Sequence, residues 1–405
     1  MSETLDSKSF LSAEDREAAL FADLPEKIAN AKLNSGHYAK LFAGIDEQLA
    51  ANRANLCRFP ITRKSSLPEQ QKKIAPFGGI NCIDAGDMVR VFQSPGPLYE
   101  PQTAEQDYWR MGQAFYAAGF RAGELVHNTL SYHFSPGGFI MDSGARACGC
   151  AVFPAGVGNT DAQIEAIKQL RPTGYSGTPS YLIELLSRYK QADSQPCSIN
   201  KAMVSGEPVT AEMQQEFQRN GINVYQAYAT AELGLIAYQA EGEQGLIVAE
   251  DIIVEVVDPE GYPVPEGDVG EVVVTTLNSK FPLIRFATGD LSAKMPIPKE
   301  SSRTNIRLKG WLGRADSAVK VKGLFVYPHQ VEEICRRHNV KGSLKIERQG
   351  HKDSITFFCQ QGDSSVNDIQ STLQSVTKLK GEVLFVPAGM PNELPLIDDK
   401  RQLVT

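Results

Sequence analysis

The pattern of apolar and polar positions alternates between two periods through the middle of the chain. Short apolar runs at residues 152–154 and 203–204 are typical of buried strands. Between them, residues 160–170 place Ile164, Ile167 and Leu170 at helical spacing, which predicts one inward face. This alternation predicts an α/β fold with a doubly wound sheet, whose ligands bind outside the carboxyl ends of its strands.

Helix start signals and strand signals extend this prediction. Residues 12–15 form a capping-box pattern that opens a helical region to residue 42, and Thr178-Pro179 opens another helix. Residues 103–106 are a third such pattern, which predicts a helix that buries a stripe of apolar side chains: Tyr108, Met111, Phe115 and Ala118. Beyond residue 250 the period shortens, and residues 252–257 and 270–277 are predicted to be antiparallel strands.

Composition and charge exclude several classes of protein. A chain of 405 residues is too long for one ordinary core, so two or three domains are expected. The net charge of −7 argues against nucleic-acid binding, and no basic run suggests a membrane surface. Residues 1–10 lack the order of a signal peptide, and no stretch approaches the ~20 apolar residues of a membrane span. We therefore expect a cytoplasmic protein that contacts neither nucleic acid nor membrane.

Residues 225–234, YQAYATAELG, have the composition of a ligand site. Small residues and a glycine would let the backbone approach a ligand, with the Glu232 carboxylate in the same space. Such a carboxylate could hold Mg²⁺ against phosphate oxygens, because Mg²⁺ takes one or two carboxylates and keeps other positions for water and substrate. The alternative is a strand end with a solvated glutamate.

Two further motifs follow in the order that a nucleotide site would need. Residues 283–291, LIRFATGDL, end an apolar run in a glycine turn and Asp290, which could accept hydrogen bonds from a ribose diol. Residues 313–328, GRADSAVKVKGLFVYP, combine Arg314 with a small-residue turn and a strand. Together the three motifs resemble those of the acyl-adenylate-forming enzymes, and the surrounding sequence resembles their phenylacetate-CoA ligase branch along nearly the whole chain.

The resemblance implies an organisation and a set of site residues. It implies a large N-terminal domain at residues 1–314, with doubly wound sheets and a small β-barrel, and a mobile α+β domain at residues 315–405 that swings about Asp316. It implies ATP, Mg²⁺ and CoA as ligands, with Glu232 on the metal, Asp290 on the ribose and Arg314 on the phosphate or ribose. The other nucleotide-binding positions that it implies are Ser94, Gly96, Gly206, Glu207, Pro208, Tyr228, Ala229 and Thr230.

One of these positions departs from the family pattern. At residues 93–101, QSPGPLYEP, the family carries a loop rich in Ser, Thr and Gly that ends in lysine and wraps the ATP phosphates. Here prolines remove two backbone donors, and Glu100 stands where a cation would be expected. An acidic side chain repels a triphosphate. Either the loop moves aside, or ATP binds weakly, or the substrate differs.

The acyl site and the end of the chain supply the remaining candidates. The family places acyl-pocket residues where this chain has Tyr132, His133 and Phe134, whose rings could flank a carboxylic acid; His133 could equally be an ordinary core or surface histidine. Near the end, residues 394–401 match the family in two registers. In one of them Lys400 is the lysine that reaches the α-phosphate, and in the other that lysine is missing.

The zinc cluster found in relatives has no counterpart here, because residues 240–244 and 297–305 contain neither Cys nor His. We expect no zinc, and the seven scattered cysteines are expected to be reduced thiols. The function predicted is an AMP-forming acid–CoA ligase that activates a small aryl or other organic acid. The alternatives are a degenerate relative that binds acyl or nucleotide ligands without adenylating, and an enzyme of one half-reaction. A homodimer is left open.

Overall fold

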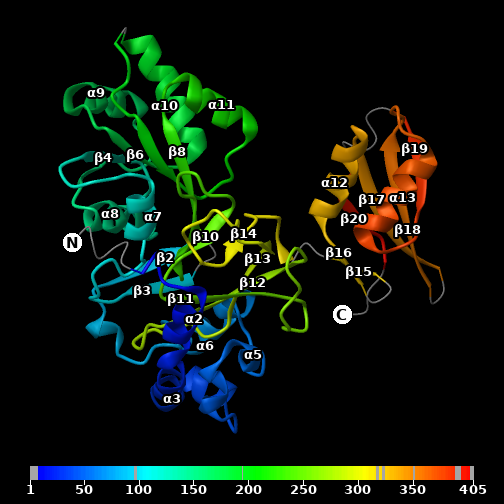
Figure 1. Cartoon of the computed structure of the whole chain (residues 1–405), viewed down its shortest axis with the longest axis horizontal. Helices are drawn as coiled ribbons and strands as arrows, with labels where there is room; N and C mark the ends of the chain where they lie inside the picture. Colours follow the sequence, from blue (N-terminus) through cyan, green and yellow to red (C-terminus); the bar gives the residue numbers. More distant parts are fainter. Residues whose placement is uncertain are drawn as a thin grey trace. The chain divides into compact units, whose positions relative to one another are not determined.

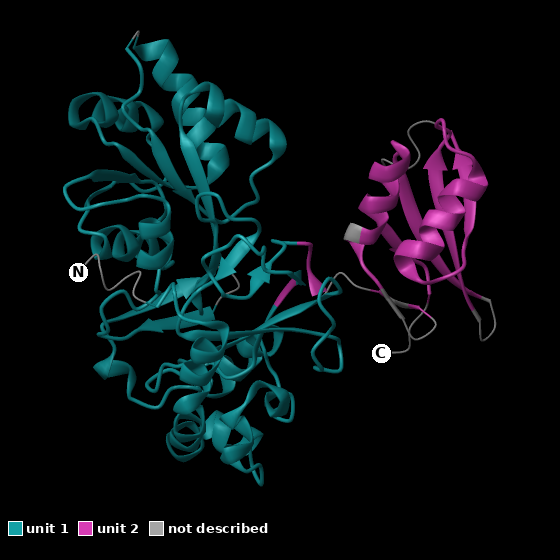
Figure 2. Ribbon diagram, viewed as in Figure 1, with its two compact units in different colours: residues 1–288, 292–311 teal, residues 289–291, 312–405 magenta. Residues whose placement is uncertain are grey.

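The computed structural model of the chain describes residues 8–94, 98–193, 195–315, 319–321, 324–349, 352–387 and 394–401. Two compact units share these residues: unit 1 is 1–288 with 292–311, and unit 2 is 289–291 with 312–405 (Figure 2). The domain boundary predicted between residues 314 and 315, and the predicted mobility of the C-terminal domain, stay predictions.

Unit 1 begins with helical segments and continues as mixed α/β structure (Figure 1). Its helices are α2 (Ala13–Ala22), α3 (Leu24–Asn34), α4 (Gly36–Leu41), η1 (Glu47–Ala51), α5 (Arg53–Leu56), η2 (Lys64–Ser66), α6 (Leu67–Lys73), η3 (Ala85–Asp87), α7 (Gly112–Ala117), α8 (Gly137–Ala147), α9 (Thr160–Leu170), α10 (Pro179–Ala192) and α11 (Ala211–Arg219). The strands of the chain up to residue 308 are β1 (Thr62–Arg63), β2 (Arg90–Ser94), β3 (Leu98–Gln102), β4 (Leu125–Asn128), β5 (Ala151–Pro154), β6 (Gly174–Gly177), β7 (Lys201–Val204), β8 (Asn223–Thr230), β9 (Gly234–Tyr238), β10 (Leu246–Val248), β11 (Ile252–Val257), β12 (Val269–Thr276), β13 (Phe286–Met295) and β14 (Arg307–Leu308).

Five neighbouring strands form the doubly wound part of the sheet. Strands β5, β4, β6, β7 and β8 lie side by side in that order and are all parallel. The two faces of β7 show why helices cover both sides. Ala202 and Val204 pack into the core under α9, α10 and α11, whereas Met203, between them, packs into the core that holds α7 and α8. The doubly wound prediction is confirmed.

The same sheet continues from β8 through antiparallel strands. The order is β9, β10, β14, β13, β12 and β11, and β11 pairs with β12 from Ile252↔Thr276 to Val257↔Glu271. The antiparallel pair predicted at residues 252–257 and 270–277 is therefore confirmed. Strand β1 also pairs with β13, in parallel, with Thr62 opposite Phe286. Closure of these strands into a small barrel stays a prediction.

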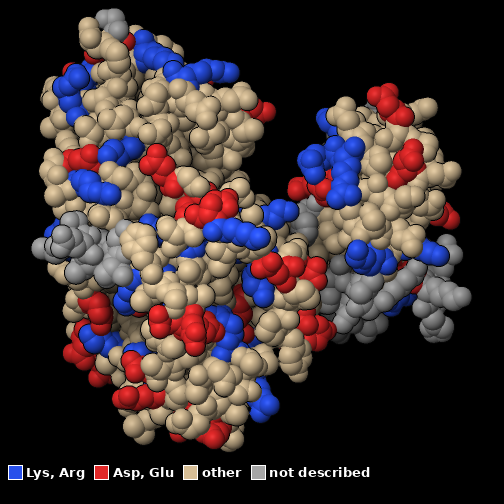
Figure 3. Space-filling model, in the orientation of Figure 1, with Lys and Arg blue, Asp and Glu red and all other residues tan. Residues whose placement is uncertain are grey.

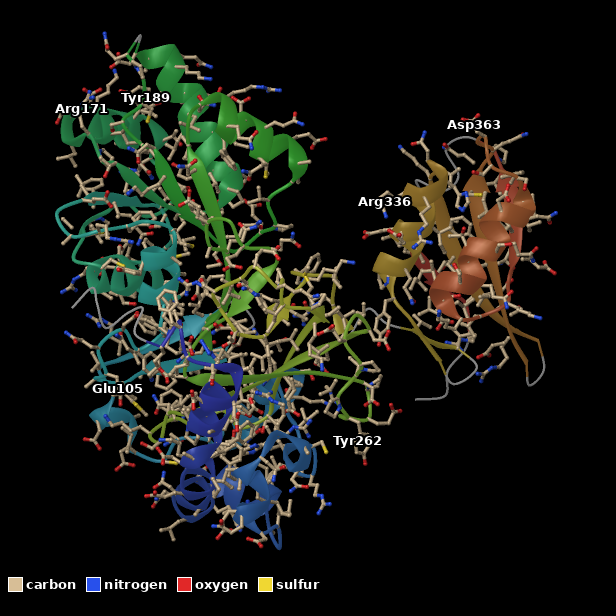
Figure 4. The ribbon with its side chains drawn as sticks, viewed as in Figure 1. Glu105, Arg171, Tyr189, Tyr262, Arg336 and Asp363 are labelled. Carbon is tan, nitrogen blue, oxygen red and sulfur yellow. The ribbon has the colours of Figure 1, made fainter. Side chains whose placement is uncertain are left out.

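Unit 2 is an α+β unit with its own apolar core. Its elements are β15 (Val319–Val321), β16 (Leu324–Val326), α12 (Pro328–His338), β17 (Gly342–Gln349), β18 (Lys352–Gln360), α13 (Val366–Thr377), β19 (Glu382–Val386) and β20 (Ile397–Asp399). The sheet order is β19, β18, β17, β20, and its core includes Leu344, Phe357 and Leu373. Arg336 lies on the exposed side of α12 (Figure 4).

Two details of the predicted helices are wrong. No helix begins at Thr103: β3 reaches Gln102, and α7 begins only at Gly112. Asp107 and Arg110 have positive φ angles of 47° and 60°, which a right-handed helix cannot contain. Met111, Phe115 and Ala118 are nonetheless buried as predicted, and Tyr108 packs at the edge of the core. In α9, Ile164 and Ile167 are buried but Leu170 is 46% exposed, because it lies on the last turn, next to the left-handed cap at Arg171.

The surface carries charges of both signs. On the face seen in Figure 3, lysine and arginine side chains are interspersed with aspartate and glutamate over unit 1. None of the helices within the described ranges is both long and apolar enough to span a bilayer.

A buried ion pair joins Arg285, the residue just before β13, to Glu255 of β11. The Arg285 guanidinium lies 2.9 and 3.1 Å from the two oxygens of Glu255 and donates to the carbonyls of Phe59 and Gly261, each at 2.7 Å. Both side chains of the pair are 2% exposed. Both charges are therefore removed from water, and the ion pair together with the two backbone carbonyls offsets the cost of their desolvation.

Replacing Glu255 with glutamine is expected to lower the free energy of unfolding by about 3–5 kcal/mol, because the guanidinium loses its counter-charge inside the protein. Urea unfolding followed by the fluorescence of buried Trp109 measures the change. The control is Glu69→Gln, which breaks the exposed Lys72–Glu69 pair and is expected to cost under about 1 kcal/mol. Equal losses in the two variants would contradict the prediction.

Candidate nucleotide and acyl site

Glu232 lies in the tight turn between β8 and β9. The two strands pair as an antiparallel hairpin with an irregularity at Tyr228 and Ala229, and the Thr230 hydroxyl accepts a bond of 3.2 Å from the Leu233 amide. Gly234 has φ +69°, and a Cβ there would come within 2.7 Å of the Trp109 side chain. Gly234 therefore leaves room for Trp109, and the approach of this turn to a ligand stays a prediction.

The Glu232 side chain is buried, with 3% of its surface exposed. The Lys64 ammonium, at the start of η2, lies 2.7 Å from Oε1 without hydrogen-bond geometry. Neither carboxylate oxygen accepts a hydrogen bond from any other described residue. The alternative of a solvated strand-end glutamate is therefore wrong, because a carboxylate this buried lacks both water and a full set of partners.

The segment expected to wrap phosphates is a short β-hairpin. Strands β2 and β3 pair from Arg90↔Gln102 to Ser94↔Leu98, and Gly96, in the turn, lies outside the described residues. Glu100 is 3% exposed and folds back on the hairpin: its carboxylate accepts from the Ser94 hydroxyl at 2.5 Å and from the Ser94 amide at 3.2 Å. Glu100 and Ser94 therefore satisfy each other.

Burial raises the pKa of Glu100 to about 8. The Ser94 hydrogen bonds and the Lys64 charge lower it, and the Glu232 charge raises it further. At neutral pH the Glu100 carboxyl is consequently protonated for the most part, which weakens the repulsion that its sequence position suggests.

This pKa predicts a stability difference that depends on pH. Between pH ~4.5 and ~8 the folded protein keeps a proton that the unfolded chain has released, so the free energy of unfolding falls as pH rises through this window. Glutamine cannot ionise. Glu100→Gln is therefore expected to exceed the parent in stability by roughly 2–5 kcal/mol at pH 9 and to match it near pH 5. Urea unfolding at both pH values measures the gap, and a gap that does not change with pH would contradict the prediction.

The structure brings Asp290 and Arg314 together within unit 2. Their backbones form an antiparallel bridge, and a guanidinium nitrogen lies 3.1 Å from Oδ1 of Asp290. Gly289 leaves room for this contact, because a Cβ at Gly289 would lie 2.6 Å from Nη2 of Arg314. The ribose and phosphate roles of this pair stay a prediction.

The other candidates for nucleotide contact lie after β7 and within β8. Gly206 has φ +90°, and the Glu207 carboxylate accepts from the Ser180 amide at 2.9 Å, at the N-terminus of α10. Pro208 follows, in the segment leading to α11. The Tyr228 hydroxyl donates to Thr288 at 3.4 Å, which ties β8 to β13. These contacts position the backbone, and their role toward adenine stays a prediction.

The predicted acyl loop follows β4. Tyr132 is half-buried: its hydroxyl accepts from Asn128 at 2.7 Å and donates to Asp142 at 3.2 Å. His133 and Phe134 are exposed, and their rings meet edge to face at 4.7 Å. The Phe134 carbonyl accepts from the Gln93 amide at 3.0 Å, so the aromatic loop is attached to the β2–β3 hairpin.

At the end of β20, two cations have different surroundings. The Arg401 side chain is 3% exposed and pairs with Asp353 and Asp399, each at 2.7 Å. Lys400 is 57% exposed and lies 2.9 Å from Asp398. Of the two, only Lys400 presents its charge to solvent. The predicted hinge, Asp316, lies outside the described residues.

Sequence reasoning missed Lys64 and the two residues that hold Tyr132. Lys64 is 168 positions from Glu232 and carries no local motif. Asn128 and Asp142 lie on either side of the aromatic loop in the sequence and both hydrogen-bond the Tyr132 hydroxyl. An amide and a carboxylate at this spacing around a Gly-rich turn are the signal that could have predicted these two hydrogen bonds.

Comparisons with known proteins show the family to which the chain belongs. A family model described as AMP-binding enzyme matches residues 104–278. Phenylacetate-coenzyme A ligase of Aromatoleum evansii is 30% identical over 350 residues, 81% of this chain and 78% of that protein. The ligase of the same name from Thermus thermophilus is 32% identical over 310 residues, 72% of this chain and 68% of that protein.

A solved structure shares the fold. A crystal structure of 2-hydroxyisobutyryl-CoA ligase, in an open conformation with 2-HIB-AMP and CoA, has a TM-score of 0.84 at 20% sequence identity, covering 98% of this chain and 92% of that chain. The chain belongs to the AMP-binding, acyl-adenylate-forming enzymes. Within that class it belongs to the phenylacetate-coenzyme A ligase branch. These similarities support an enzyme of the AMP-forming acid–CoA ligase type and give no support to a degenerate relative.

Proposed function

We propose that the protein is an AMP-forming acid–CoA ligase that activates a small organic acid, with an aryl acid favoured by its branch. The observation that carries the proposal is the buried carboxylate of Glu232, which has one charged partner and no other among the described residues. Membership of the phenylacetate-coenzyme A ligase branch supports it.

The Glu232 site fits a divalent cation. Its Oε2 atom is buried and has no partner in the described part of the chain, and a carboxylate oxygen is the donor that Mg²⁺ prefers. No three His, Cys, Asp or Glu side chains gather there within the described ranges, which suits an ion whose remaining ligands are phosphates and water. When bound, Mg²⁺ would neutralise charge on the ATP phosphates.

The protein's contribution is positioning and charge neutralisation. The carboxylate of the acid attacks the α-phosphorus of ATP and pyrophosphate leaves; the CoA thiol then attacks the acyl-adenylate and AMP leaves. Asp290 would accept hydrogen bonds from the ribose diol, Arg314 would bind the phosphate or ribose, and Lys400 would bind the α-phosphate. The loop from Tyr132 to Phe134 would select the acid.

The test is exchange of labelled pyrophosphate into ATP, run with Mg²⁺ against a panel of aryl and fatty acids. Exchange that depends on one class of acid is expected, followed by thioester formation when CoA is added. No exchange with any acid, together with calorimetric binding of AMP or CoA, would overturn the ligase proposal and leave a binding protein or an enzyme of the second half-reaction.

A further inference from the structure

Lys64 is held in the neighbourhood of Glu232 by the fold. It directly follows β1, whose two residues pair in parallel with Phe286 and Ala287 of β13. The next residue of β13, Thr288, is bonded to Tyr228 of β8, the strand that leads into the turn of Glu232. The pairing of β1 with β13 thus brings Lys64, the first residue of η2, to the turn of Glu232.

The pair is unequal in two respects. The Glu232 side chain is 3% exposed, whereas the Lys64 side chain is 33% exposed, so the lysine is the more accessible partner of the pair. The contact at 2.7 Å also lacks hydrogen-bond geometry. An ammonium has three donors, and an ammonium held by charge alone keeps them available to another anion.

Residues 93–101 of the β2–β3 hairpin contain no lysine or arginine, and Arg90, at the start of β2, donates to Gln102 and lies over the Phe139 ring. Glu100, in the middle of β3, is bonded to Ser94, and its electrostatic surroundings include both Lys64 and Glu232. Lys64 is therefore the positive charge that the described residues place beside the hairpin and the carboxylate together. A polyphosphate that entered here would meet two carboxyl groups and this one ammonium.

We propose that Lys64 is the phosphate-binding cation of this site, substituting from η2 for the cation that residues 93–101 lack. Glu232 holds it while the site is empty. With a nucleoside triphosphate and a divalent cation bound, Glu232 would hold the metal and the Lys64 ammonium would donate to the β- or γ-phosphate oxygens. The proposal rests on the proposed function and specifies the polyphosphate part of the site.

Calorimetric titration with pyrophosphate and with MgATP tests the proposal on the full chain. Lys64→Met is expected to weaken binding of both by about tenfold to 100-fold, from loss of one charge-assisted contact. Lys64→Arg keeps the charge and is expected to restore binding to within about threefold. Adenosine, which carries no phosphate, is expected to bind all three proteins equally. The matched control is Lys72→Met, at an exposed lysine on the adjacent helix α6.

A purely structural role would have a different signature, because Lys64→Met leaves Glu232 buried without its partner. Thermal melting of each variant is therefore measured, and steady-state assays follow the KM for ATP and for the acid separately. The expected result is a rise in the KM for ATP with the KM for the acid unchanged. Equal rises in both, with a lowered melting temperature and no rescue by arginine, would overturn the proposal.

The failure of this proposal can be told from failure of the ligase proposal. If the Lys64→Met variant exchanges pyrophosphate at the wild-type rate and binds pyrophosphate as tightly as the wild type, the role of Lys64 is refuted and the ligase proposal is unaffected. A wild-type protein that neither exchanges pyrophosphate nor binds MgATP would overturn both.

Discussion

Glu232→Gln is expected to lower acid-dependent pyrophosphate exchange by about 100-fold or more. A metal that binds phosphate oxygens contributes several kcal/mol to stabilising the charge that develops during adenylation, and each 1.36 kcal/mol is tenfold in rate. Glutamine keeps the shape of the side chain but is a weak metal ligand. The fold is expected to survive, because the Lys64 ammonium is partly hydrated once its partner is neutral.

The measurement is exchange rate against Mg²⁺ concentration, with calorimetric binding of MgATP. The control is Glu124→Gln, which breaks a second lysine–glutamate pair of the same 2.7 Å length, with Lys201. That variant is expected to keep full exchange. Retention of more than about a tenth of the parent rate in Glu232→Gln would refute the assignment of Glu232 to the metal.

Much of the fold could be predicted because its elements are set by local pattern. Helix α10 begins where Thr178 caps Tyr181 and Pro179 fixes the first turn, both of which the sequence displays. The strand pair β11–β12 follows from β-branched runs on either side of a turn. The helix predicted from the capping pattern at Thr103 does not form, because Asp107 and Arg110 adopt positive φ angles. The capping pattern carries no information about these angles.

Candidate site residues could be named from the sequence where a local motif contains them. Residues that reach the site from distant segments of the chain could not. Glu232 belongs to a ten-residue motif and was found. Its partner Lys64 belongs to none, since the pairing of β1 with β13 brings it there. Glu100 was predicted to repel the ATP phosphates, but in the structure its carboxyl group is hydrogen-bonded to Ser94. This contact depends on the pairing of β2 with β3, which the composition of the segment does not reveal.

Lys400→Ala is expected to reduce pyrophosphate exchange by about 100-fold, the second large effect. In the register in which Lys400 meets the α-phosphate, removal of the ammonium takes away a charge-assisted contact that strengthens as charge develops. Arg401 is committed to Asp353 and Asp399, whereas Lys400 presents its charge to solvent, where it could meet a ligand; the choice of register stays a prediction. Removing Lys400 also leaves these two pairs in place, so the stability of unit 2 is expected to be unchanged.

The decisive measurement separates the two half-reactions. The Lys400→Ala variant is expected to lose exchange yet to convert a supplied acyl-adenylate and CoA into thioester at a rate within about threefold of the parent, because thiol attack on the adenylate does not require the lysine that stabilised pyrophosphate departure. Lys380→Ala, at an exposed lysine of the same unit, is the control and should keep both activities. Full exchange in Lys400→Ala would instead place Lys400 in the basic tail, and this chain would then lack the adenylation lysine. In that case Lys64 and Glu232 would have to account for phosphate binding without it.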